Sequence, residues 1–230
     1  MMELTPLEQE ALLLSLKVGF FAVAWSLPLA ILVGWLLARK NFPGKNIFNG
    51  IIFLPLVLPP VVVGYLLLVG FGNQGIFGRP LQEWFGFSFM FSWRGATLAA
   101  AVASFPLMVT SIRLGLEAVD RRLETAAATL GAPPGKIFLT VTLPLMAPGI
   151  LAGMVLAYAR SLGEFGATIT FVSLIPGETR TIPLAIFSLT QVPGGEALAA
   201  RLVIIAIVVA LSALMISEFF NRRMKKYIHG

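Results

Sequence analysis

Long stretches without a charged residue limit the possible folds of this chain more than any other feature. Uncharged intervals lie at 18–38, 46–78, 95–112, 137–159 and 202–217. A helix of roughly 20 apolar residues crosses the hydrocarbon core of a bilayer. Charged residues make up 12% of the chain, about half the share in soluble domains. The sequence therefore predicts an all-α polytopic membrane protein.

The composition also excludes several kinds of chemistry. The chain has no cysteine, so it cannot form disulfides, thiolate metal sites or cysteine nucleophiles, and its one histidine is His229. No segment alternates between apolar and polar residues as a transmembrane β-strand would. The net charge of +6 is expected for a membrane protein, because basic residues gather in its cytoplasmic loops. We expect no metal, no cofactor and no nucleic-acid partner.

Five transmembrane helices are expected in a single domain that spans residues 1–230, with its core at 11–220. They are placed at 12–38, 47–71, 94–112, 146–170 and 201–220. Glu3, Glu8 and Glu10 precede the first of them. A cleaved signal peptide begins with a positive segment, so we expect this N-terminus to stay attached.

Lysine and arginine in the loops predict the orientation. With the N-terminus outside, eleven lie on the inner side: Arg39, Lys40, Lys45, Arg113, Arg121, Arg122, Lys136, Arg222, Arg223, Lys225 and Lys226. Five lie outside: Lys17, Arg79, Arg94, Arg180 and Arg201. The positive-inside rule then predicts an external N-terminus and a cytoplasmic C-terminus. A sixth crossing in 173–200 would reverse this parity, but the prolines and charges there argue against it. A short or re-entrant segment in 171–200 stays open.

The inner connection 113–145 has the pattern of a folded loop. Asp120 is placed to cap a helix over 121–130, and Gly131 is placed to end it. A second short helix is expected over 135–141, after which Leu143-Pro144 should break the chain. A compact pair of helices of this kind suits docking into a groove on another protein.

This connection resembles the EAA loop of ABC importer permeases. That pattern reads Glu-Ala-Ala, three residues, Gly, nine residues, then Ile-x-Leu-Pro, and Thr125 takes its first position here, with Glu124 one residue earlier. The resemblance implies a coupling helix in a cleft of an ATP-hydrolysing subunit. It assigns the coupling role to Glu124, Thr125, Ala126, Ala127, Gly131, Leu143 and Pro144.

Prolines interrupt the second expected span. Pro55, Pro59 and Pro60 must disturb its hydrogen-bond ladder, and the freed carbonyls need protein or water around them. The span is either a bent helix that lines a passage, with Pro59 and Pro60 on the path, or an ordinary kink packed in protein.

The fourth expected span combines small residues with two charges. Small residues recur every fourth position at Gly149, Gly153, Ala157 and Ser161, a pattern that permits close helix contact. Arg160 and Glu164 are spaced to form an ion pair. Because unpaired charges in a membrane are costly, we expect them to pair inside the protein. They either lie beside the route of an anion or form a structural pair.

Longer segments resemble the oxyanion branch of these permeases, and molybdate systems in particular. The resemblance is carried by Ser161 to Thr168, Ile169 to Ser173, Ile175 to Pro183, Pro55 to Tyr65, Ser92 to Ala96 and Pro193 to Glu196. It implies the type I ABC importer permease fold in the cytoplasmic membrane and molybdate transport by alternating access. Tungstate or sulfate/thiosulfate transport is the alternative.

The same resemblance implies partners for this subunit. It implies two ATP-binding subunits on the cytoplasmic side and an extracytoplasmic binding protein. Five helices are few to enclose a hydrated path, so we also expect a homodimer embedded in membrane lipid. The chain has no Gly-x4-Gly-Lys-[Ser/Thr] motif to cradle phosphates, so ATP hydrolysis is expected in a partner. An intramembrane enzyme or a passive channel is a weaker alternative.

Overall fold

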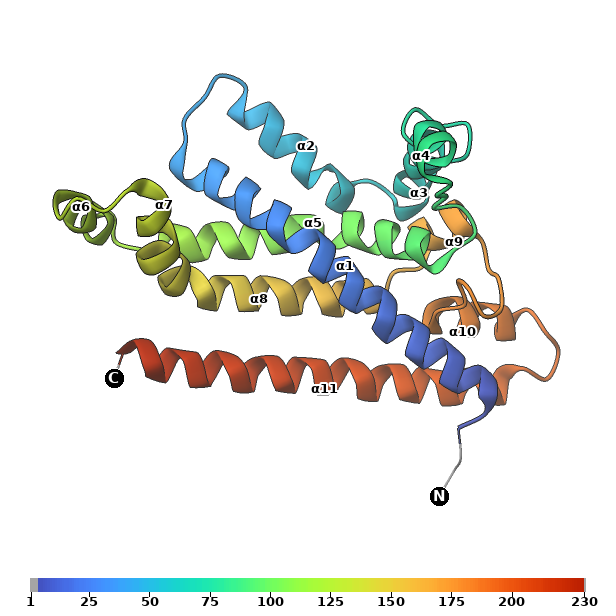
Figure 1. Cartoon of the computed structure of the whole chain (residues 1–230). Helices are drawn as coiled ribbons and strands as arrows, with labels where there is room; N and C mark the ends of the chain where they lie inside the picture. The colour runs from blue at the N-terminus through green and yellow to red at the C-terminus, as the bar shows by residue number, and fades with distance from the viewer. Residues whose placement is uncertain (1–3, 230) are drawn as a thin grey trace.

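The computed structural model describes the backbone of residues 4–229 and the side chains of residues 4–215, and helices account for all its regular structure. The elements are α1 Pro6–Arg39, α2 Lys45–Val57, α3 Pro60–Phe71, α4 Gly78–Phe85, α5 Trp93–Glu117, α6 Arg121–Thr129, α7 Pro134–Ile137, the π-helical turn η1 Phe138–Thr142, α8 Leu143–Leu162, α9 Gly166–Val172, α10 Ile182–Thr190 and α11 Glu196–His229 (Figure 1). The all-α class predicted from the sequence is confirmed.

Four stretches within the described residues are long and apolar enough to cross a membrane. They are α1, α5, the continuous run Pro134–Leu162, and Glu196–Met215 in α11. The pair α2 and α3 would make a fifth span, bent by 115° at a short break. This count agrees with five expected spans only if the bent pair crosses as one.

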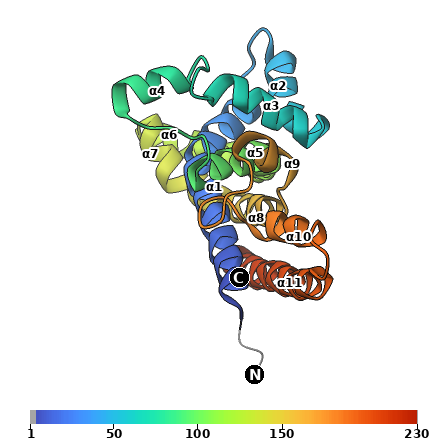
Figure 2. The same ribbon diagram turned by 90° about the vertical axis from the view of Figure 1, so that its right-hand side faces the viewer.

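The long helices run side by side, and the short ones gather at their two ends. α6, α7 and the C-terminal end of α11 lie at one end of the molecule, whereas the start of α1, α4 and α10 lie at the other (Figure 1). α5 packs against both α1 and α8. The view from the N-terminal end places α2 and α3 on one side of this central group and α11 on the other (Figure 2). The expected loop 113–145 and the last turns of α11 therefore share one end.

Small residues allow α5 and α8 to approach closely, as the spacing in the fourth span predicts. A Cβ atom added at Gly149 would lie 2.6 Å from the Cα atom of Gly115, and one added at Gly153 would lie 3.0 Å from the carbonyl oxygen of Met108. Ala157 is fully buried on the same face of α8. This contact anchors the C-terminal side of the loop to the core.

The fourth span ends earlier than the sequence suggested. α8 stops at Leu162 rather than continuing to residue 170, and the chain turns at Gly163 into the separate helix α9. α9 packs against α3, where a Cβ atom at Gly64 would meet the carbonyl oxygen of Ala167 at 2.7 Å. The prediction of one helix over 146–170 was wrong because apolar composition alone does not show a turn.

The expected break at Leu143-Pro144 was also wrong. The helix runs on through α7, η1 and α8, and the expected helix at 135–141 is the first part of this run. In η1 the amide of Leu143 donates to the carbonyl of Phe138, five residues earlier. The wider π-helical turn lies just before Pro144, which has no N–H to donate and would crowd a regular α-helical turn.

The connection 171–200 contains the nine-residue helix α10. At 1.5 Å per residue such a helix spans about 14 Å, roughly half the hydrocarbon core. α10 packs against α1 and α11. It is therefore a short helix at the N-terminal end of the bundle and does not cross it.

Candidate functional site

The loop that precedes α8 forms the helix that its sequence predicts. The carboxylate of Asp120 accepts a hydrogen bond of 2.9 Å from the amide of Arg122 at the start of α6. At the other end, Gly131 has a φ of +81°, a left-handed conformation that favours glycine. The amide of Ala132 donates to the carbonyl of Ala127 over 3.2 Å. The expected helix over 121–130 and the expected end of that helix at Gly131 are both confirmed.

One face of α6 presents apolar side chains to its surroundings. Leu123 is 48% exposed and Leu130 is 88% exposed, and Ala126 between them is also exposed. Ala127 is half-buried, so it lies toward the rest of the loop. An exposed stripe of this kind at the end of a bundle is typical of a surface that binds another protein.

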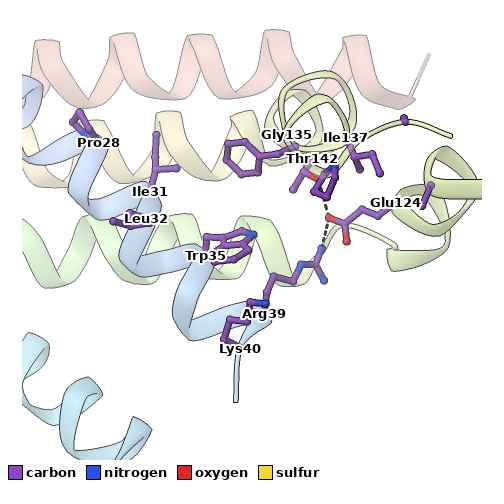
Figure 3. Close-up of a pocket in the computed structure, with 14 residues that line it drawn as sticks. Pro28, Ile31, Leu32, Trp35, Arg39, Lys40, Glu124, Gly135, Ile137 and Thr142 are labelled. Carbon is purple, nitrogen blue, oxygen red and sulfur yellow. Dashed lines mark hydrogen bonds and ion pairs between the residues drawn. The ribbon is translucent and has the colours of Figure 1, made fainter. Parts of the chain in front are cut away.

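Glu124 joins three segments on the other face of α6. Its Oε1 atom lies 3.0 Å from Nη2 of Arg39 at the end of α1, and it accepts a 2.8 Å hydrogen bond from Oγ1 of Thr142 in η1 (Figure 3). The side chain of Arg39 is only 10% exposed. We call Glu124, Arg39 and Thr142 the brace. No motif in the sequence indicates that Arg39 and Thr142 belong to this site.

Thr125, which takes the Glu position of the EAA pattern, lies differently. It is exposed, and its hydroxyl donates to the carbonyl of Arg121 in its own helix. Leu143 packs against the core, and Pro144 is exposed at the start of α8. Of the residues that the sequence assigns to coupling, Ala126 therefore lies on the exposed stripe, Glu124 belongs to the brace, and Leu143 and Pro144 form the base of α8.

A groove of about 910 Å³ lies next to the brace, between α1 and the loop (Figure 3). Trp35 and Lys40 line it on the α1 side, and Ile137 and Phe138 line it on the loop side. Its α1 wall continues along the helix to Pro28. The groove is thus apolar along α1 and charged where α1 ends.

The second candidate site lies where α8 turns into α9. Nη1 of Arg160 is 2.8 Å from Oε2 of Glu164, which is the ion pair that their spacing predicts. Glu164 is 2% exposed, and its other oxygen accepts a 2.9 Å hydrogen bond from the amide of Ala167 in α9. Arg160 keeps 32% of its side chain exposed. The pair thus consists of a buried carboxylate and a partly accessible guanidinium.

The proline-rich break between α2 and α3 lies beside this turn. Pro59 precedes α3 and Pro60 is its first residue. A Cβ atom added at Gly166 would lie 2.6 Å from the Cβ atom of Pro60. The structure therefore brings Pro60 next to the turn that Glu164 stabilises.

In the described part of the chain, no group of three His, Cys, Asp or Glu residues could hold a metal ion.

Two further ion pairs hold the start of α1 at the opposite end of the molecule. Oε1 of Glu8, a residue only 1% exposed, lies 3.0 Å from Nε of Arg201 in α11. Oε2 of Glu10 lies 3.1 Å from Nη2 of Arg180, and Glu10 also accepts a 2.5 Å hydrogen bond from the amide of Gly177. The two pairs join residues 193 and 170 positions apart, so the spacing in the sequence does not indicate them.

Comparisons with known proteins agree on one family. The family described as "binding-protein-dependent transport system inner membrane component" matches residues 28–226. The molybdenum transport system permease protein of Escherichia coli strain K12 is 62% identical over 221 residues, and that of Haemophilus influenzae is 59% identical over 220, each covering 96% of both chains. A crystal structure of a bacterial ABC transporter that imports alginate has a chain of the same fold, with a TM-score of 0.74 and 18% identity over 96% of this chain and 80% of that one.

Proposed function

The chain belongs to the family of binding-protein-dependent transport system inner membrane components, and on that premise we propose that it is the permease subunit of an ATP-driven molybdate importer. The near-full-length similarity to molybdenum permeases of two organisms carries this proposal. Membership of a family of inner membrane transport components also means that the chain is a multi-pass membrane protein and not an enzyme.

The energy for transport would come from separate subunits. The chain lacks a phosphate-binding Walker A motif, so two ATP-hydrolysing subunits would bind at the end that carries α6. The exposed leucines Leu123 and Leu130 would enter a cleft on each ATPase subunit. A binding protein would deliver the anion at the opposite end, where α4 and α10 lie (Figure 1).

The brace supports a mechanical role for the loop. Glu124 on α6 contacts both Arg39 at the end of α1 and Thr142 just before α8. A displacement of α6 by an ATPase subunit would therefore reach two membrane helices through short, partly buried contacts. We infer that ATP binding and hydrolysis drive alternating access in a homodimer, with the path between the two copies.

The turn between α8 and α9 would contribute to the path. Arg160 carries a positive charge that remains partly accessible, and Glu164 offsets that charge from a buried position. A guanidinium partly neutralised in this way would attract an oxyanion without holding it tightly. Pro59 and Pro60, at the adjacent break, would shape the wall of the path.

Transport by reconstituted vesicles tests the proposed function. The chain is co-purified with its ATPase subunit, placed in liposomes and supplied with the binding protein and radiolabelled molybdate. We expect uptake that requires ATP and that unlabelled molybdate suppresses more strongly than sulfate does. Stronger suppression by sulfate or tungstate would show that this anion, and not molybdate, is the preferred substrate. Uphill uptake without the ATPase would contradict the ABC mechanism.

A further inference from the structure

The groove between α1 and the loop has the length, depth and charge of a lipid site. We propose that an anionic phospholipid of the cytoplasmic leaflet binds in it, with an acyl chain along α1 and the phosphate beside Lys40. The placement rests on the proposed function, which puts α6 on the cytoplasmic side.

The apolar part of the groove follows one face of α1. Pro28, Ile31, Leu32 and Trp35 lie at helical spacing along it (Figure 3), and Leu32 is 59% exposed. The rise from Pro28 to Lys40 is about 18 Å at 1.5 Å per residue. That length is close to the roughly 15 Å depth of one hydrocarbon leaflet. An acyl chain laid along this face would reach from the membrane surface to near the bilayer centre.

Positive charges gather where the apolar part ends. Nζ of Lys40 lies 5.5 Å from the centre of the Trp35 ring. Lys45 donates to the carbonyl of Lys40 over 3.0 Å, and Arg121 approaches the carbonyl of Ala38 at 3.5 Å. The carboxylate in the groove, Glu124, is already neutralised by Arg39. The three remaining cations would attract a phosphate, and a tryptophan beside them is typical of the membrane interface.

The position of the groove in the membrane favours a lipid over an extended protein segment. An extended peptide laid along Ile31 and Leu32 would place unpaired backbone groups in the hydrocarbon region, which is costly. An acyl chain has no polar groups to satisfy there. A lipid bound in this position would also fill the space between α1 and the loop beside the brace.

Native mass spectrometry of the purified full-length chain, titrated with dioleoylphosphatidylglycerol or dioleoylphosphatidylcholine, tests the proposal. We expect one tightly bound phosphatidylglycerol per chain and weaker binding of phosphatidylcholine. Lys40→Gln should weaken phosphatidylglycerol about five-fold, the effect of one cation near an anionic surface, without changing phosphatidylcholine. Leu32→Trp should weaken both lipids because it fills the acyl part of the groove.

Lys17→Gln is the matched control. Lys17 also lies over a tryptophan ring, with its Nζ atom 3.8 Å from the centre of Trp93, but it lies in the N-terminal half of α1, 23 residues before Lys40. We expect this variant to bind phosphatidylglycerol like the wild type. Equal binding of the two lipids, equal losses in Lys17→Gln and Lys40→Gln, or no loss in Lys40→Gln would each overturn the proposal. Release of the lipid when the ATPase subunit binds would also overturn it, because a protein segment would then fill the groove.

Discussion

Arg39 and Glu124 form an ion pair of 3.0 Å although 85 residues separate them in the chain. The contact fixes the end of α1 to α6, the first helix of the loop 113–145. Thr142 adds a hydrogen bond to the same carboxylate oxygen from just before α8. One side chain therefore connects the loop to the helices on both sides of it, which makes Glu124 the residue through which movement of α6 would reach the membrane domain.

Replacing Glu124 should reduce stability far more than replacing its neighbour. Glu124→Ala leaves the mostly buried Arg39 without its partner, which we expect to cost about 3 kcal/mol. Thr125→Ala removes an exposed hydroxyl and should cost less than about 0.5 kcal/mol. Denaturant unfolding of the two variants in detergent measures the difference. Equal losses would show that Glu124 does not brace the loop.

An aspartate on the exposed stripe should prevent association with the ATPase subunit and leave the fold intact. Leu130 is 88% exposed, so Leu130→Asp buries no charge in the free subunit, although it would do so in a protein interface. Trp84→Asp, on the exposed face of α4 at the opposite end, is the control. Co-purification with the ATPase should fail for Leu130→Asp and succeed for Trp84→Asp. Retention of the ATPase by Leu130→Asp would refute docking through this face.

Two glycines on the bent pair should respond in opposite ways to alanine. Gly64→Ala places a methyl group 2.7 Å from the carbonyl oxygen of Ala167, so α9 must shift, at a cost of about 1–3 kcal/mol. Gly50 in α2 has no atom within 4 Å of an added Cβ, and Gly50→Ala should gain up to about 1 kcal/mol of helix propensity. Thermal unfolding of both variants checks this pair. No loss of stability in Gly64→Ala would mean that α3 and α9 do not pack as described.

Removing Arg160 alone should harm the protein more than removing both charges of its ion pair. Arg160→Met leaves the carboxylate of Glu164, 2% exposed, buried without its cation, at an expected cost of about 3–5 kcal/mol. In the double variant Arg160→Met, Glu164→Gln, the neutral amide can still accept from the amide of Ala167, so most of the stability should return. Unfolding curves give this comparison.

Uptake by the same double variant tests the role of Arg160 in the path. If the guanidinium lies beside the anion, the folded double variant should take up molybdate at a rate well below that of the wild type. Wild-type uptake would show that the pair is structural only.

Local signals in the sequence predicted the loop well. Asp120 and Gly131 mark the two ends of α6 because capping and left-handed glycine depend on nearby residues alone. The prolines at 59 and 60 marked the break between α2 and α3 for the same reason. The spacing of Arg160 and Glu164 predicted their pairing, although Glu164 lies just past the end of α8.

Features that depend on tertiary contacts could not be predicted. The π-helical turn before Pro144 keeps the helix continuous, and no sequence pattern distinguishes it from a break. The end of α8 at Leu162 follows from the packing of α9 on α3. Arg39 and Arg201 meet their carboxylate partners across 85 and 193 residues, and from one sequence nothing identifies which charges pair over such distances.

The membrane side of α6, and its contact with the ATPase, can be measured with one cysteine. Because the chain has no cysteine, Leu130→Cys gives a unique label on the exposed stripe, and Trp84→Cys gives one at the opposite end. We predict that an impermeant maleimide labels Leu130→Cys in inverted vesicles but not in intact cells, and that bound ATPase blocks this labelling. Trp84→Cys should be labelled in intact cells but not in inverted vesicles, and the ATPase should not protect it. Labelling of Leu130→Cys from outside the cell, or no protection by the ATPase, would contradict the account.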